Sequence, residues 1–226
     1  MEQFEPTPEN KEAGEKQALW YKTMEQLDQV ADRLGKRIDA GIKETVAAFA
    51  VNKFPTNGSC EGHVEERFGK KVKLRPYIDI GFREPKQRFV GESEIKERIA
   101  AEYGITAEEV EDNDAADKAY WEYTHKQDVP ETPEFMEILA KNKELERSFQ
   151  QALEAFYQNR QVGKDTKLIV KPIGPIRRLY ITTAKENPKS VAESELEQYR
   201  QELSAEQEEV RALTQFLKER FFNQTS

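Results

Sequence analysis

A single stretch, residues 54–63 (FPTNGSCEGH), most constrains what this chain can fold into. Its proline ends the helical pattern before it, because the residue that precedes a proline avoids the helical region. The stretch also holds two glycines, the only cysteine of the chain and one of its two histidines. The run that follows, residues 75–82, alternates as a strand does. The sequence therefore predicts a turn between a helix and a strand, and this turn is where we look first for chemistry.

Apolar residues recur at three- and four-residue steps in several segments, a spacing typical of helices with one buried face. These segments are residues 10–34, 39–54, 93–103, 106–123 with a break near 112–114, 133–162, and a last helix from 190 or 194 to 222. The interior of the last helix, residues 202–209, is almost wholly polar. We expect that part to lie in water or to pair with another long helix.

Three runs have the composition of strands: residues 71–82, 167–171 and 178–183. The last two are joined by a segment rich in proline and glycine, which predicts a hairpin. The fold class is therefore α+β and helix-rich, with long amphipathic helices packed on a small antiparallel sheet. We expect a frayed tail over 1–10, a single α+β domain over 11–183, and a C-terminal long helix over 184–226 that packs on the domain or on a partner.

The charge balance restricts the partners. The chain has a net charge of -8, a sequence pI near 5.2 and 35% charged residues. Such a surface disfavours a nucleic-acid partner and an anionic membrane, although whether the basic hairpin between Lys171 and Arg178 contacts phosphate stays open. One cysteine forms no intramolecular disulfide, and no apolar run is long enough to span a bilayer. We therefore expect a cytoplasmic protein.

The spacing of Cys60 and His63 matches half of a zinc site, because thiolate and imidazole are both good zinc ligands. A closed site needs about four ligands. Glu61 or Asp79 would have to help complete it, since the chain has no second cysteine. Zinc is thus one cofactor hypothesis.

The same residues also suit covalent or acid–base catalysis. Cys60 would be the nucleophile, His63 the base and Asp79, on the following strand, the group that orients the imidazole.

The leading hypothesis is a small-ligand site, for an anion or a nucleotide, at the turn over residues 56–63. Gly58 and Gly62 allow backbone amides to line a concave anion site. Further ligand-binding candidates are Thr56, Ser59, Glu61 and Tyr77. Against all three chemistries stands a structural interpretation, in which Cys60 is a small buried side chain in a tight turn. The protein would then be an adaptor that forms a homodimer or holds a partner through its long helices.

Three segments together resemble a group of uncharacterised bacterial and phage proteins that carry S-C-x-G-H between a helix and a strand. They lie within residues 38–46, 55–63 and 76–80, and the resemblance extends over about positions 34 to 82, roughly a fifth of the chain. It implies a shared site at the helix–strand junction.

Residues 56–63 are also distantly similar to the T-x-S-S-C-S-G-R turn of the tRNA wybutosine-synthesis methyltransferase family, which uses S-adenosylmethionine and a tRNA purine. Here His63 stands where that family has arginine, and Glu61 where it has serine. This likeness implies only that such a turn can lie at a ligand site.

Overall fold

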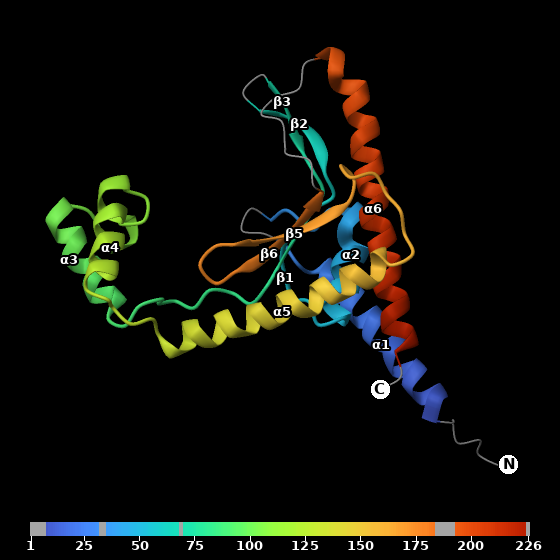
Figure 1. Ribbon diagram of the computed structural model, residues 1–226, viewed down its shortest axis with the longest axis horizontal. Coiled ribbons are helices and arrows are strands. Elements are labelled where there is room, and N and C mark those ends of the chain that lie inside the picture. Colours follow the sequence, from blue (N-terminus) through green and yellow to red (C-terminus); the bar gives the residue numbers. More distant parts are fainter. Residues whose placement is uncertain (1–7, 32–34, 68–69, 184–192, 225–226) are drawn as a thin grey trace. The chain divides into compact units, whose positions relative to one another are not determined.

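The computed structural model describes residues 8–31, 35–67, 70–183 and 193–224 (Figure 1). The chain separates into two compact units, one formed by residues 1–81 and 144–226 and the other by residues 82–143. The predicted helix-rich α+β class is confirmed. The sequence did not predict the separate unit over 82–143. Of the expected tail and C-terminal segment, residues 1–7, 184–192 and 225–226 lie outside the described part.

The larger unit is built on a four-stranded antiparallel sheet in the order β1-β4-β6-β5. The strands are β1 (Thr56–Cys60), β4 (Tyr77–Ile80), β5 (Leu168–Ile173) and β6 (Arg178–Thr183). β5 and β6 form the predicted hairpin, in which Leu168 lies opposite Thr183. β6 pairs in turn with β4.

One face of this sheet forms the core of the unit. Ile78 and Ile80 of β4 lie opposite Ile181 and Leu179 of β6, and none of the four is measurably exposed. The predicted alternation of β4 is thus confirmed, with Tyr77 and Asp79 on the other, half-buried face. Apolar side chains from four helices complete the core: α1 (Pro8–Asp28), α2 (Ala40–Val51), α5 (Pro133–Tyr157) and α6 (Leu196–Asn223).

The helix expected over residues 10–34 is shorter in the structure. α1 ends at Asp28, and Ala31 then forms an isolated β-bridge with Arg37. Residues 32–34 lie outside the described part. α2 packs against both α1 and α6, and most of its residues are buried, including the small Ala47 and Ala48.

The turn expected over residues 56–63 is mostly strand. Residues 56–60 form β1, an edge strand that pairs with β4, and only Glu61 and Gly62 make the turn. The chain continues into a separate hairpin of β2 (His63–Arg67) and β3 (Lys70–Leu74). The run at 71–82 therefore divides between two sheets, and Phe82 lies beyond β4 with 38% of its surface exposed.

The smaller unit is helical. It contains α3 (Glu92–Tyr103), a 3-10 turn (Ala107–Glu109), α4 (Asp114–Lys126) and the beginning of α5. The capping box between Thr106 and Glu109 is present, but it starts the short 3-10 turn, and Asn113 caps α4 itself. The core of the smaller unit consists of Phe89, Ile95, Ile99, Ala100, Val110, Ala116 and Tyr120.

The polar interior of α6 lies only partly in water: Ser204, Ala205 and Glu208 are exposed, as expected from the sequence, but two of its glutamates are buried. Glu206 and Glu209 are only 3% and 2% exposed. Glu206 pairs with Arg75, which precedes β4 and also donates to the Thr183 hydroxyl at 3.1 Å. Glu209 pairs with Arg160 at 2.6 Å. Buried carboxylates are tolerated because each has an arginine partner from outside the helix.

This arrangement predicts that Arg75→Met destabilises the larger unit by about 3–5 kcal/mol, because it leaves the Glu206 carboxylate buried and unpaired. Arg75→Met combined with Glu206→Leu should recover most of that loss. The measurement is urea unfolding followed by Trp20 fluorescence in a Trp121→Phe background, since Trp20 lies in the core of this unit.

The control is Arg211→Met, because the exposed pair between Arg211 and Glu208 should contribute less than about 1 kcal/mol. A cost for Arg75→Met no larger than that of the control would contradict the buried-pair interpretation.

Candidate metal centre

Cys60 and His63 meet across the two-residue turn between β1 and β2. The Cys60 Sγ lies 3.6 Å from the His63 Nδ1, and the Gly62 amide donates a hydrogen bond to the same sulfur at 3.4 Å. Gly62 has a φ of 82°, and a Cβ there would come within 2.7 Å of Pro76. Glycine is therefore required for the backbone to fold back and aim its N–H at the sulfur.

The third member of the cluster is Asp39, at the N-cap position of α2. Its side chain makes no capping hydrogen bond. Instead, the Glu61 carboxylate accepts a hydrogen bond from the Gly41 amide at 2.8 Å, which satisfies one of the unpaired N–H groups of the first turn. The Asp39 carboxylate is thereby left to pair with Lys36 at 3.2 Å and to face the cysteine and histidine.

One ligand atom from each of Asp39, Cys60 and His63 lies within 4.8 Å of the other two. Among the described residues, no other group of three such side chains comes together in this way. Cys60 is buried, whereas Asp39 and His63 are partly exposed. The cluster therefore has one buried side and one side open to solvent.

α6 holds the turn in place. The Gln207 side-chain amide donates to the carbonyl oxygens of Glu61 and Gly62 at 3.2 and 3.1 Å. Leu203, one helical turn earlier, would come within 2.8 Å of a Cβ at Gly62, so it packs directly on the turn. The turn that carries the cluster is thus held by a helix residue about 145 positions away in the sequence.

Burial is the main influence on the thiol. It raises the pKa of Cys60 above its usual value, and the nearby Asp39 carboxylate raises it further. The Gly62 N–H and the Lys36 ammonium act in the opposite direction, because both favour the thiolate. At neutral pH the thiol by itself is protonated, which is unlike an activated nucleophile.

The structure places Tyr77 beside this cluster and Asp79 farther along the same strand. Tyr77 lies opposite Cys60 in the sheet, and its ring stacks on Tyr180 with centroids 5.0 Å apart. Asp79 lies opposite Gly58 and pairs with Arg178 at 3.2 Å. The acidic neighbour of Cys60 and His63 is therefore Asp39, at the N-terminus of α2. It takes the place that the sequence analysis had assigned to Asp79.

Two other predicted ligand-binding residues lie away from the thiol. Thr56 and Ser59 are opposite Ile80 and Ile78 in the β1–β4 register, so their side chains share the core face of the sheet. Cys60 is on the other face, opposite Tyr77. The predicted ligand set is therefore divided between two faces, and Glu61 acts as a cap for α2.

Sequence reasoning missed Asp39 and Gln207 as members of the site. The sequence identified Asp39 only as a helix start, and nothing in the local pattern of Gln207 distinguishes it from its polar neighbours in α6. The available signal was that the sequence offers two carboxylates, Asp39 and Glu61, for the start of this helix. One helix start needs only one carboxylate as a cap, so the other is left for a different role.

No protein-family model matches this chain, and comparisons with curated proteins and with solved structures give no match either. The predicted resemblances therefore stay predictions. Within the described part of the chain, no helix combines the length and the apolar character needed to cross a membrane.

Asp79 yields a pH-dependent prediction. Burial raises its pKa above the ordinary value, and Arg178 only partly opposes this effect. The contribution of Asp79 to stability is thus fully present below the pKa of the unfolded carboxyl and is lost as the pH rises through the folded-state pKa. Asp79→Asn should therefore raise the urea midpoint at pH 7, and the gain should shrink as the pH falls to about 4.

The matched control is Asp165→Asn, which alters an exposed carboxylate of the same unit. Its urea midpoint should stay at the wild-type value at both pH values. An Asp79→Asn protein that is less stable than wild type at pH 7 would show that the Arg178 pair outweighs desolvation.

Proposed function

We propose that this protein binds a transition metal ion of the zinc class through Asp39, Cys60 and His63. The observation that carries the proposal is the convergence of a carboxylate, a thiol and an imidazole within 4.8 Å. These are the three side-chain types that zinc prefers.

The distance between sulfur and nitrogen fits a shared metal. A tetrahedral zinc with its sulfur at about 2.3 Å and its nitrogen at about 2.0 Å holds those two atoms about 3.5 Å apart. The Cys60 Sγ and the His63 Nδ1 are 3.6 Å apart. The ligand pair therefore needs little rearrangement to hold an ion.

The surroundings supply the support that a metal thiolate needs. The Gly62 N–H points at the sulfur, and hydrogen bonds to a thiolate stabilise its charged form. A divalent ion would also compensate the two negative charges of Asp39 and the Cys60 thiolate, so it would displace the proton that burial keeps on the thiol.

Three protein ligands leave one tetrahedral position for water or for a small ligand, which is the pattern of sites that act on substrates. The small-ligand hypothesis is thereby narrowed to a molecule that coordinates the metal on its solvent side, near Tyr77. The ion would act there as a Lewis acid on a bound oxygen.

Two alternatives have less support. Cys60 as a free nucleophile would require an exposed, easily ionised thiol, whereas the residue is only 6% exposed and burial raises the pKa of its thiol. An adaptor that assembles through α6 would require a free apolar face. The apolar residues Val210, Leu213, Leu217 and Phe221 of that helix are already buried in the core of the larger unit.

The test is zinc binding by tag-free protein that has been stripped with a chelator, measured by competition with a chromophoric chelator. We expect one ion per chain, with affinity lowered more than about 100-fold by Cys60→Ala or His63→Ala and at least about tenfold by Asp39→Asn. Zinc should also raise the unfolding midpoint of the wild-type protein, since a ligand of the folded state stabilises it.

The control is His125→Ala, which removes the other histidine, an exposed residue of α4 in the smaller unit. Its zinc affinity should equal that of wild type. Zinc binding that survives in Cys60→Ala, or a chain that binds no zinc while iodoacetamide alkylates Cys60 rapidly, would overturn the proposal.

A further inference from the structure

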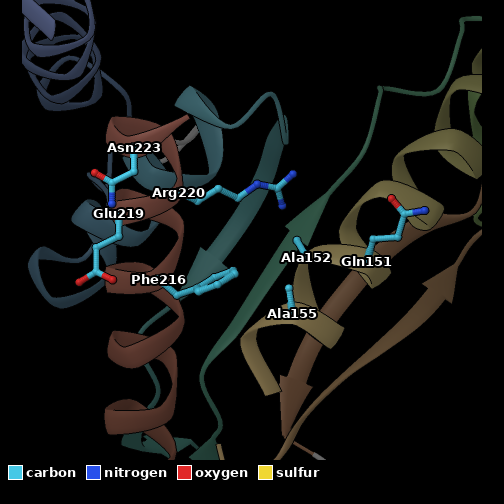
Figure 2. A pocket seen from close by; sticks show the side chains of 7 residues that line it. All are labelled: Gln151, Ala152, Ala155, Phe216, Glu219, Arg220 and Asn223. Carbon is cyan, nitrogen blue, oxygen red and sulfur yellow. The ribbon is translucent and has the colours of Figure 1, made fainter. Parts of the chain in front are cut away.

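A second candidate site lies in the larger unit, between the C-terminal parts of α5 and α6. It is a cavity of about 410 Å³ that is open to solvent, and of its lining residues only Ala152 is buried. Its lining consists of Gln151, Ala152 and Ala155 from α5 and Phe216, Glu219, Arg220 and Asn223 from α6 (Figure 2).

The cavity exists because the two helices approach each other unevenly. Phe156 of α5 and Phe216 of α6 are in contact, with ring centroids 5.5 Å apart. Beside that contact, α5 presents the methyl groups of Ala152 and Ala155, with Gln151 next to them. Two small side chains opposite large ones leave an open space with an apolar floor.

Arg220 gives this cavity its charge. Figure 2 shows the arginine side chain extending from α6 toward α5, whereas Glu219 points away from α5. Glu219 accepts a hydrogen bond from Gln215 at 2.8 Å. Within the described residues, the Arg220 guanidinium forms no ion pair, although most other arginines of the larger unit do.

We propose that this cavity binds a small organic monoanion, a carboxylate attached to an apolar body. Arg220 would receive the carboxylate in a bidentate geometry, and the body would lie against Ala152 and Phe216. A monoanion is favoured over a phosphate because Arg220 is the single cationic side chain among the lining residues. This site is independent of the proposed metal centre.

The experiment compares 4-phenylbutyrate with its uncharged amide, using ligand-observed NMR on chelator-treated protein so that no bound metal contributes. The two probes share their apolar body and differ in charge. We expect the carboxylate to bind about ten- to a hundredfold more tightly than the amide, because only the carboxylate forms charge-assisted hydrogen bonds with Arg220.

Two variants locate the binding. Arg220→Gln should reduce carboxylate affinity to that of the amide, and Ala155→Trp should abolish binding of both probes by filling the cavity. Arg211→Gln is the matched control, since Arg211 is exposed on the same helix and pairs with Glu208. It should bind as wild type does.

Equal binding of the two probes, unchanged carboxylate affinity in Arg220→Gln or in Ala155→Trp, or the absence of carboxylate binding to the wild-type protein would each overturn this proposal. None of these results would bear on zinc binding at Cys60, which is measured separately.

Discussion

The buried carboxylate of Glu206 is the constraint on which the rest of the larger unit depends. A charge that is 3% exposed has to be paired, and its partner Arg75 comes from the segment that leads into β4. The ion pair between Arg75 and Glu206 fixes the position of α6 next to the beginning of β4. Gln207, the next residue, then lies where its amide holds both carbonyls of the Glu61–Gly62 turn. The geometry of the cysteine and histidine thus follows from an ion pair that never contacts them.

The local parts of the fold could be predicted from the sequence, because their signals are local. The 3.6-residue period gives the helices, and the proline- and glycine-rich connection gives the β5–β6 hairpin. The strand character of residues 56–60 could not be predicted in this way. A segment with the composition of a turn becomes an edge strand only because β4 offers it backbone hydrogen bonds. The buried glutamates of α6 were missed for the same reason, since their arginine partners are distant in the sequence.

The candidate site was half predictable. The spacing of Cys60 and His63 singled out two residues whose Sγ and Nδ1 atoms lie 3.6 Å apart in the structure, and their role in a site stays a prediction. The acidic member could not be assigned, because Asp39 reaches the site only when Glu61 has taken over the capping of α2. Such an exchange of roles between two carboxylates depends on tertiary contact. It also leaves Asp39 facing a thiol whose pKa it raises, and a bound cation would relieve that unfavourable arrangement.

The most direct test of the central claim is X-ray absorption at the zinc edge on the stoichiometric zinc complex of the wild-type protein. The account predicts a first shell with one sulfur at about 2.3 Å and the remaining ligands, nitrogen or oxygen, at about 2.0–2.2 Å. A first shell without sulfur would place the metal away from Cys60. Two or more sulfurs would require cysteines from different chains, since each chain has only one. Either result would contradict a mononuclear site built from Asp39, Cys60 and His63.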